Sequence, residues 1–539
     1  MAPVTAPPAL VLTGASGFVG RHLLDEFKDD HRIFAIARRS QRECGAPVHP
    51  NIAWMRVDIA DRDGLARTFR EIASAGGAET LVHLAGYYDF TGEDHPEYRR
   101  TNVEGTRNVL EAARSARVRR FVFASSVAAC AFPRPEGPVT ERTPPDGDHV
   151  YARSKREGEA LVREAAGLLP SSIVRLGAIY SDWCEYPPLY VFLSTWLGRS
   201  WRARVLAGRG KMSIPYIHVR DLVSFFRHLL RAGHGLEPAE VLLASTAEDT
   251  PLDRLYELAT RAYFGEARRP VFVPRLVAGA GLLAMDLAGR AVGHRSFEHP
   301  WMRHYLDRRL QVDNARSCRR IGWAPRPRYH IERRLPFATE RLRSEPFEWL
   351  ARNTAVLTRA TLRPDLTIYQ ALLEGESQIV AALVRAIETE RESAVLDAFR
   401  RMSRPELEWH ARLFYRLLLS SVESGNRMLV VNYLEVTGPS RFAAGFGAEE
   451  ISLFLRRLDQ AVLGWLAERE EVRGFRRELH DRVTVPLELA ADEVREQHER
   501  YLAEPLRLRE AAAEAASPSA RSAREALEET IWTCLVQRR

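Results

Sequence analysis

Short apolar runs alternate with longer helical patterns over the first 180 residues. The candidate strands cover residues 9–13, 32–37, 52–57, 80–84, 120–125 and 172–176. Apolar residues at helical spacing lie between them, for example over residues 97–116 and 151–168. Alternation of this kind is typical of a parallel, doubly wound α/β sheet. We therefore predict one such domain over residues 1–180.

The pattern changes twice further along the chain. Residues 181–345 are less regular and contain several prolines, which indicates a smaller mixed part that binds substrate. From residue 346 to 504 proline and glycine thin out, and apolar residues follow i, i+3, i+4, i+7 spacing, which predicts an all-helical bundle. The tail at 505–539, rich in Ala, Glu and Arg, is either a solvated helix or disordered.

The most apolar stretch of the chain is residues 276–287. It is interrupted by Asp286 and bounded by Arg275 and Arg290. A helix needs about 20 apolar residues to span a bilayer, so this stretch is too short. We expect a buried or pocket-lining helix here, and no integral membrane segment.

Composition and charge narrow the class of protein. The 539 residues are 45% apolar and 28% charged, an ordinary globular balance that excludes a disordered or fibrous chain. Residues 1–345 carry 51 bases and 40 acids, a net charge of +11, and residues 346–539 carry 27 bases and 31 acids, a net charge of −4. Acids are interleaved with the arginines throughout, so we expect no nucleic-acid partner.

The cysteines indicate neither a disulfide framework nor a metal site. All five lie far apart in the sequence, without a CxxC pair or a Cys/His ligand spacing. This usage fits a reducing compartment, and the N-terminus lacks the basic region and apolar run of a signal peptide. We expect a cytoplasmic protein without a bound metal.

A glycine-rich loop follows the first predicted strand. Gly14, Gly17 and Gly20 stand between the strand and a helical pattern, within the segment TGASGFVG at residues 13–20. Glycines at these steps allow a tight turn and a close approach of backbone to a pyrophosphate, and the helix N-terminus offers free N–H groups. We therefore predict a Rossmann-type dinucleotide site.

The end of the second strand indicates which dinucleotide binds. An acidic residue there would bind a ribose 2′-hydroxyl, whereas an arginine favours a 2′-phosphate. The strand ends in Arg38 and Arg39, and the nearby acids Asp29 and Asp30 precede it. We favour NADP(H), and NAD(H) remains the alternative.

Tyr151 and Lys155 open a helical pattern four residues apart, so their side chains share one face of the helix. A nearby ammonium favours the phenolate and lowers the pKa of a tyrosine from its usual value of about 10. Tyr151 would then be a proton donor and acceptor at neutral pH. Lys155 is one of only three lysines in the chain, and Ser126 lies at the end of a predicted strand. The alternative is a pair on the helix surface.

Together these residues resemble the extended short-chain dehydrogenase/reductase family, which includes sugar-nucleotide epimerases, 3β-hydroxysteroid dehydrogenase-like enzymes and dihydroflavonol reductase-like enzymes. The resemblance covers about residues 9–340 and rests on ordered motifs. It implies a catalytic set of Ser126, Tyr151, Lys155 and Asn102. It also implies that the cofactor is bound by Gly14, Ser16, Gly17, Phe18, Val19, Gly20, Arg38, Arg39, Asp58, Ile59, Leu84, Ala85, Gly86, Ser125, Tyr151, Lys155 and Ala178.

Two departures from the family pattern bear on the substrate. Sugar 4,6-dehydratases carry an Asp-Glu pair just after the catalytic hydroxyl residue, where this chain has Val127 and Ala128. The Tyr-Gly that often follows in sugar epimerases is Cys130-Ala131 here. The first departure disfavours dehydratase chemistry, and the second, together with the apolar stretch at residues 276–287, favours a substrate less like a sugar.

Aromatic residues after the fourth strand and in the smaller part are candidates for substrate specificity. They are Tyr87, Tyr88, Phe90, Tyr180, Trp183, Tyr186, Tyr190 and Trp196. An aromatic cluster at a pocket would suit a ring-bearing or apolar substrate, and core packing is an equally good interpretation.

The resemblance implies an NADP(H)-dependent oxidoreductase that transfers hydride to or from a carbonyl or secondary alcohol on a small molecule. One alternative is an NAD(P)-dependent sugar-nucleotide epimerase. Another is a regulator that senses the dinucleotide, with the helical half as its signalling arm. Residues 445–458 resemble the N-terminal four-helix sensor domains of stress-signalling regulators, and a dimerisation bundle is the other interpretation. We expect a homodimer.

Overall fold

The computed structural model describes residues 7–132, 137–198, 200–292, 297, 299–358, 364–389 and 396–503. The chain divides into two compact units, Met1–Thr361 and Leu362–Arg539. The boundary expected at residue 346 therefore falls inside the first unit as the structure divides it. The division expected at residue 180 stays a prediction, and the tail at 505–539 lies outside the described residues.

The first unit is built on a seven-stranded sheet in the order β11-β6-β5-β4-β1-β2-β3, with every neighbouring pair parallel. Its strands are β1 (Ala9–Thr13), β2 (Arg32–Ala37), β3 (Ile52–Arg56), β4 (Thr80–His83), β5 (Arg120–Ser126), β6 (Ser171–Leu176) and β11 (Glu240–Ala244). The prediction of a doubly wound parallel sheet is confirmed. Six of these strands lie where the sequence pattern predicts them, whereas β11, which lies far from the others in the sequence and pairs with β6, was not predicted.

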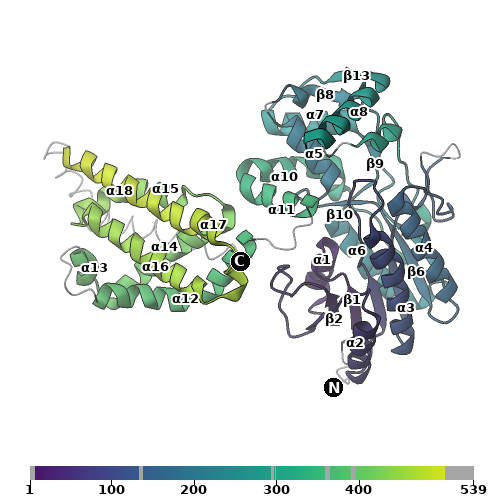
Figure 1. Ribbon diagram of the computed structural model, residues 1–539, viewed down its shortest axis with the longest axis horizontal. Helices are drawn as coiled ribbons and strands as arrows, with labels where there is room; N and C mark the ends of the chain where they lie inside the picture. Colours follow the sequence, from purple (N-terminus) through teal and green to yellow (C-terminus); the bar gives the residue numbers. More distant parts are fainter. Residues whose placement is uncertain are drawn as a thin grey trace. The chain divides into compact units, whose positions relative to one another are not determined.

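Helices cover both faces of the sheet (Figure 1). On one face, Leu24 of α1 (Phe18–Phe27) and Phe226 of α6 (Val219–Ala232) share a core with the sheet residue Leu12. On the other face, α2 (Arg62–Ser74), α3 (Thr106–Ser115) and α4 (Val150–Ala165) pack on a second core that includes Phe123. The helix expected at 97–116 begins as a π-helical segment, η1 (Tyr98–Gly105), before it continues as α3.

A smaller mixed part follows β6. Its strands form three short pairs: β7 (Ala178–Tyr180) with β10 (Tyr216–His218), β9 (Ser213–Ile214) with β12 (Thr250–Pro251), and β8 (Val205–Ala207) with β13 (Val271–Val273). Its helices are α5 (Pro187–Trp196), α7 (Leu252–Phe264), α8 (Arg275–Val292), α9 (Ala315–Ile321), α10 (Ile331–Ser344) and α11 (Pro346–Thr358). Short helical turns are η2 (Val127–Ala129), η3 (Trp201–Arg204), η4 (Gly233–Gly235), η5 (Pro300–Tyr305) and η6 (Pro327–Tyr329).

The prediction for the apolar stretch at 276–287 is half right. The stretch forms α8, but its apolar side is not buried, since Leu276 is 89% exposed and Leu287 is 68% exposed. Among the side chains of this helix that the structure describes, the buried one is Asp286, whose carboxylate lies 3.8 Å from His299 Nδ1. Hydrophobic spacing locates an apolar helix face, but it does not state whether that face contacts protein.

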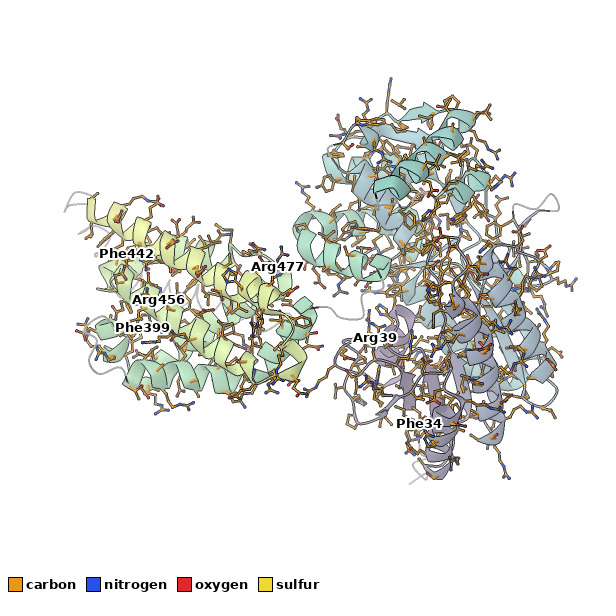
Figure 2. The ribbon with its side chains drawn as sticks, in the orientation of Figure 1. Phe34, Arg39, Phe399, Phe442, Arg456 and Arg477 are labelled. Atoms are coloured by element: carbon orange, nitrogen blue, oxygen red, sulfur yellow. The ribbon has the colours of Figure 1, made fainter. Side chains whose placement is uncertain are left out.

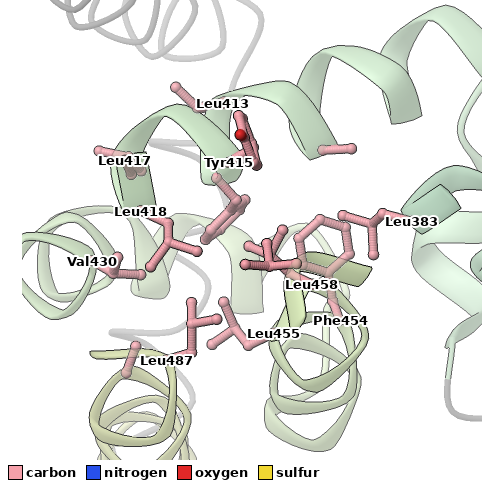
Figure 3. Packing of buried hydrophobic residues seen from close by; sticks show 14 of the residues in the cluster. Leu383, Leu413, Tyr415, Leu417, Leu418, Val430, Phe454, Leu455, Leu458 and Leu487 are labelled. Atoms are coloured by element: carbon pink, nitrogen blue, oxygen red, sulfur yellow. The ribbon is translucent and has the colours of Figure 1, made fainter. Parts of the chain in front are cut away.

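The second unit is helical throughout its described residues. Its elements are α12 (Pro364–Thr389), α13 (Asp397–Arg401), α14 (Arg404–Ser424), α15 (Leu429–Ala443), α16 (Ala448–Ala467), η8 (Glu470–Val472), α17 (Arg476–Leu479), η9 (His480–Thr484) and α18 (Val485–Ala503). Leu383, Tyr415, Val430, Phe454 and Leu487 bring side chains from five helices into one core (Figure 3). The predicted helical bundle is therefore confirmed.

Candidate active site

The loop between β1 and α1 has no room for side chains at two of its glycines. Gly14 has a φ of +70°, and a Cβ there would lie 2.6 Å from the backbone nitrogen of Ala85. A Cβ on Gly20 would lie 2.4 Å from the Gly14 carbonyl oxygen. At Gly17 a Cβ would meet only that same oxygen, at 3.1 Å. Beyond this one contact, the space in front of Gly17 is open.

Helix α1 begins directly after Gly17, and among the described residues no side chain caps its first turn. Its N–H groups and the positive end of its dipole therefore suit an anion. Phe18 and Val19 form the first turn, and Ser16 is buried in the loop before it. The open space at Gly17 and this helix end fit the pyrophosphate of a dinucleotide.

Two arginines follow β2. Arg39 donates a 3.1 Å hydrogen bond to the carbonyl oxygen of Ser16, which ties this residue to the glycine loop. Figure 2 labels Arg39 in the purple part of the first unit. The side chain of Arg38 is 60% exposed, and its Nη1 lies 3.8 Å from Oε2 of Glu97. Arg56, at the end of β3, donates to the Arg38 carbonyl oxygen at 3.1 Å.

Arg38 also borders a pocket of about 440 Å³ between the ends of β2 and β3 and the start of α2. The lining includes two further arginines, Arg56 and Arg67. Two of the three acids in the lining are already engaged, because Asp58 pairs with Arg100 at 2.6 Å and Asp61 accepts from the Gly64 amide at 3.0 Å, and the third is the exposed Glu71. This arrangement leaves the Arg38 guanidinium in a position to meet an added phosphate.

Asp58 and Ile59 follow β3. The Asp58 carboxylate accepts from the Ala60 amide at 3.0 Å and from Arg100. Burial opposes ionisation, but these donors outweigh it and lower the pKa of Asp58. Ile59 is buried, and its carbonyl oxygen accepts from Asn108 at 3.0 Å. The adenine contacts expected of Asp58 and Ile59 stay a prediction.

Asn102 holds together the segment after β4 and the helix α4. Its Oδ1 accepts from the Tyr87 amide at 2.6 Å, and its Nδ2 donates to the Tyr87 carbonyl and to Ser154 Oγ, each at 2.9 Å. Asn102 lies in the π-helical segment η1, a kind of turn that is frequent at functional sites. A Cβ on Gly86 would lie 3.4 Å from Lys155 Nζ and 3.5 Å from Asn102 Oδ1. The structure therefore brings Asn102, Gly86 and Lys155 together.

The two serines at the end of β5 differ in their surroundings. Ser125 is buried and donates to Glu159 Oε1 at 2.7 Å. Ser126 is half-buried, and its Oγ accepts from the Ala128 amide at 3.1 Å. The hydroxyl proton of Ser126 thus remains available for an acceptor, whereas Ser125 supports the strand. The remaining predicted cofactor residues are placed mainly by backbone bonds: the Leu84 amide donates to Thr13, the Ala178 amide donates to Pro215, and Ala85 lies against Gly14.

Tyr151 and Lys155 lie on the side of α4 that faces β5 and η1. Lys155 Nζ donates to the Ala124 carbonyl oxygen at 2.8 Å and lies 5.8 Å from the centroid of the Tyr151 ring. Tyr151 stacks on Tyr88 with ring centroids 4.1 Å apart. The i, i+4 spacing therefore places the Lys155 ammonium and the Tyr151 phenol on the same side of α4, as the sequence predicts.

Burial lowers the pKa of Lys155 from 10.5 to about 8, and the Glu159 carboxylate opposes this change. The ammonium is thus only moderately stable, and a new acceptor such as a ribose hydroxyl would stabilise it. His83 is also buried beneath this site, between Thr13 Oγ1 at 2.6 Å and Thr106 Oγ1 at 3.0 Å. Burial and the charge of Lys155 lower the pKa of His83 to about 3, so His83 is neutral and structural.

A pocket of about 350 Å³ opens beside Tyr151. Its walls are largely aromatic, with a polar side formed by Asp148, His304 and Arg308. The full lining is Tyr88, Gly92, Tyr98, Phe132, Asp148, His149, Tyr151, Trp301, His304, Tyr305 and Arg308. A phenol at the wall of a concave, aromatic pocket is the arrangement expected of a substrate site.

The aromatic residues proposed from sequence divide between this pocket and the core. Tyr88 lines the pocket, and Phe90 packs on Tyr88 with centroids 4.2 Å apart. Tyr180 and Trp196 are buried in the core of the smaller part, so core packing is the correct interpretation for them. Trp183, Tyr186 and Tyr190 pack around that same core, and Tyr87 hydrogen-bonds Asp89 at 2.9 Å.

Several pocket residues were missed in the sequence. Trp301, His304 and Tyr305 come from η5, about 150 residues after Tyr151, and no spacing rule connects the two segments. Tyr98 could have been predicted from the sequence, because it lies four residues before Asn102 on the same helical segment. His149 could have been predicted too, since it caps α4 two residues before Tyr151.

The described residues contain neither a candidate metal site nor a candidate membrane span. Among them, no group of three or more His, Cys, Asp or Glu side chains could hold a metal ion. Of the helices described, none combines the length and the apolar character needed to cross a membrane.

Part of the chain matches a known family and several known proteins. Residues 10–244 match the NAD dependent epimerase/dehydratase family. The chain is 36% identical over 174 residues to a ceramide reductase of Caulobacter vibrioides, a match that covers 32% of this chain and 46% of that protein. It is 28% identical over 335 residues to the sterol demethylase protein B of Methylococcus capsulatus, covering 58% of this chain and 93% of that one. The chain thus spans less than half of the first of these relatives and most of the second.

Among solved structures, the chain is similar to the enzyme WbmG of Bordetella bronchiseptica in complex with NAD. The two share 19% sequence identity with a TM-score of 0.49, over 64% of this chain and 96% of that one.

Proposed function

We propose, from the match of residues 10–244 to the NAD dependent epimerase/dehydratase family, that the first unit is a member of that family and an NADP(H)-dependent oxidoreductase acting on a carbonyl or secondary alcohol. The observation that carries the proposal is the position of Tyr151. Its phenol lines a pocket of about 350 Å³ while Lys155, on the same helix face, lies 5.8 Å from its ring. This pair supplies an acid/base group at the wall of a substrate-sized cavity.

The cofactor supplies or accepts the hydride when it is bound. Gly14, Gly17, Gly20 and the first turn of α1 would hold its pyrophosphate. Arg38 would hold the 2′-phosphate, because its guanidinium is exposed on a pocket wall whose carboxylates Asp58 and Asp61 already have partners. These features support NADP(H) over NAD(H), and the second arginine, Arg39, would stiffen the loop through its bond to Ser16.

Four residues of this chain would manage the substrate oxygen and its proton. Ser126 and Tyr151 would donate hydrogen bonds to that oxygen, and in reduction Tyr151 would pass its hydroxyl proton to it. Lys155 would donate to the ribose hydroxyls and stabilise the phenolate that Tyr151 leaves behind. Asn102 would be a positioning residue, because its hydrogen bonds hold the segment at Tyr87 and helix α4 at Ser154.

The site departs from sugar-modifying relatives in its chemistry. Val127 and Ala128 provide no second acid/base pair after Ser126. The pocket walls at Tyr88, Tyr98 and Trp301 present aromatic rings, which suit a ring-bearing or apolar substrate. A net oxidoreductase is therefore favoured over an epimerase that keeps its cofactor through a full cycle.

A binding and turnover experiment separates these two reactions. Native mass spectrometry of the purified chain would report any retained nucleotide, and a panel of aryl and alkyl ketones with NADPH would report turnover through nicotinamide absorbance. We expect exchangeable NADPH and a net loss of absorbance with at least one ketone. Tightly retained NAD with no net change in absorbance would contradict the proposal and support the epimerase.

A further inference from the structure

We propose that the exposed face of α8 docks the protein on the surface of an anionic lipid bilayer. The α8 face consists of six apolar residues, Leu276, Val277, Ala280, Leu283, Ala284 and Leu287, all of them exposed. They follow the i, i+4, i+7, i+11 spacing of a single helical stripe. In an ordinary surface helix such a stripe contacts the core, whereas here it faces away from the protein.

The exposure of the α8 face is large for apolar side chains. Leu276 is 89% exposed, Leu287 68%, Val277 61% and Leu283 41%. The opposite side of the helix carries Asp286, which is 5% exposed and faces His299. The helix therefore buries a carboxylate and presents its leucines outward, the reverse of the usual arrangement. Contiguous exposed apolar surface of this kind marks an interaction site.

Neighbouring elements extend the same surface. Val271 and Phe272 of β13, just before α8, are 54% and 47% exposed. Trp201 of η3 is 80% exposed, and the adjacent Arg202 lies against α8, with Nη2 3.5 Å from Met285 Sδ. An exposed indole beside an apolar face suits the interface between water and lipid, where its ring is partly desolvated.

The charge around the α8 face favours an anionic lipid surface as its binding partner. Residues 201–211 carry four bases and no acid, and residues 266–287 carry three arginines against Glu266 and the buried Asp286. Arg202, Arg204, Arg269 and Arg275 are exposed along this surface. A second copy packed face to face would bring like charges together, whereas an anionic headgroup layer would neutralise them. Apolar side chains flanked by arginines are the features of a helix that lies in the plane of a bilayer surface.

Docking through α8 would place the bilayer close to the pocket beside Tyr151. Helix α8 packs against η5, and η5 contributes Trp301, His304 and Tyr305 to the wall of the pocket beside Tyr151. Trp301 also donates to the Thr91 carbonyl oxygen at 3.1 Å, which joins η5 to the segment after β4. A bilayer that held α8 would therefore lie one element away from the pocket wall. Docking does not depend on the proposed oxidoreductase function.

Co-sedimentation of the full chain with vesicles tests the proposal. The probes are vesicles of phosphatidylcholine with one quarter phosphatidylglycerol, and vesicles of phosphatidylcholine alone. We expect binding to the first to exceed binding to the second at least tenfold and to weaken as salt is raised, because each arginine near an anionic surface contributes roughly fivefold in affinity. Equal or absent binding to both kinds of vesicle would overturn the proposal.

Substitutions in the α8 face and a control substitution outside it test which surface binds the vesicles. L276E/L287E should lower binding to anionic vesicles at least about tenfold, because two leucines would no longer enter the lipid. L168E is the control, since Leu168 is a leucine of similar exposure, 72%, outside this surface. If L276E/L287E fails to fold, as judged by circular dichroism, R269A/R275A replaces it and should lower binding roughly 25-fold.

Two results would overturn the assignment of the α8 face. One is vesicle binding that is unchanged in L276E/L287E, or lowered as much in L168E as in L276E/L287E. The other is a change of molecular mass by light scattering, without vesicles, on going from the wild type to L276E/L287E. That result would make the α8 face an interface between copies of the chain.

Discussion

The Nζ atom of Lys155 donates a 2.8 Å hydrogen bond to the carbonyl oxygen of Ala124, which joins the middle of α4 to the end of β5. This bond fixes the ammonium 5.8 Å from the centroid of the Tyr151 ring, at a place where a Cβ added to Gly86 would lie 3.4 Å from Nζ. The charge is therefore held between the phenol and the backbone at the end of β4. Each role proposed for this site depends on that placement.

Replacing Tyr151 by phenylalanine should remove turnover and leave cofactor binding nearly unchanged. The variant Tyr151→Phe loses the acid/base hydroxyl but keeps the ring that stacks on Tyr88 at 4.1 Å. General acid catalysis contributes about 10²- to 10⁴-fold, so kcat should fall by that factor. NADPH affinity, measured by fluorescence titration, should stay within about twofold.

The matched control is Tyr190→Phe, which removes a hydroxyl from a tyrosine that packs on Trp349 rather than on the pocket. It should keep wild-type turnover. Equal activity in Tyr151→Phe and the wild type would remove Tyr151 from the mechanism.

The buried ammonium of Lys155 should make stability depend on pH in a window above neutrality. Burial lowers its pKa from 10.5 to about 8 in the folded protein, so between these values the unfolded chain binds more protons than the folded one. Stability then rises with pH in this window, and Lys155→Met should lack the rise. The difference in unfolding free energy between wild type and variant should increase by about 2 kcal/mol from pH 7 to 9.5.

Urea unfolding of the cofactor-free chain, followed by hydrogen exchange of peptides from the sheet strands β1 to β6, would report on the first unit alone. Lys28→Met is the control, because Lys28 is a surface lysine paired with Asp25. Its pH dependence should match the wild type. A flat difference between wild type and Lys155→Met would show that the Lys155 ammonium is not destabilised by burial.

Arg38 should determine the preference between the two dinucleotides. Arg38→Ala removes a guanidinium that is 60% exposed on the wall shared with Arg56 and Arg67. A hydrogen-bonded charge pair is worth about 1.5–3 kcal/mol, so the Kd for NADPH should rise about tenfold or more. The Kd for NADH should change by less than about threefold.

Arg119→Ala serves as the control, since Arg119 is an exposed arginine that pairs with Glu79 at the opposite end of the sheet, before β5. A parallel loss of NADPH and NADH affinity in Arg38→Ala would assign Arg38 to the shared part of the cofactor. An unchanged Kd for NADPH would remove it from the site.

The parts of this site that sequence predicts are those governed by local rules. The glycine loop needs a strand, a tight turn and a helix within eight residues, and the pair Tyr151 and Lys155 needs one turn of helix. The pocket wall at Trp301 and Tyr305 obeys no such rule, because tertiary packing brings it to Tyr151 from about 150 residues away. The face of Leu276 and Leu287 was misjudged for a related reason, since periodicity identifies an apolar stripe without identifying its neighbour.

A buried ion pair behind the site should be the most sensitive point of the first unit. Glu159 on α4 and Arg175 on β6 are both almost fully buried and are joined by two hydrogen bonds of 2.9 Å, while Ser125 at the end of β5 donates to the same carboxylate at 2.7 Å. Burial opposes the charge on Glu159, but Arg175 and Ser125 outweigh it and lower the pKa of this carboxyl. The stability that results is present above the usual pKa of 4.5 and is lost as the pH falls below it.

Glu159→Ala would leave the Arg175 guanidinium buried without its carboxylate, which costs about 3–5 kcal/mol of unfolding free energy. Arg163→Ala is the matched control, because Arg163 contacts the same Glu159 oxygen at 2.8 Å but is 37% exposed. A pair open to solvent contributes about 0–1 kcal/mol, so this variant should remain close to the wild type. Urea unfolding at pH 7, followed through NADPH binding, measures both. Equal losses of unfolding free energy in the two variants would show that burial does not set the strength of this network.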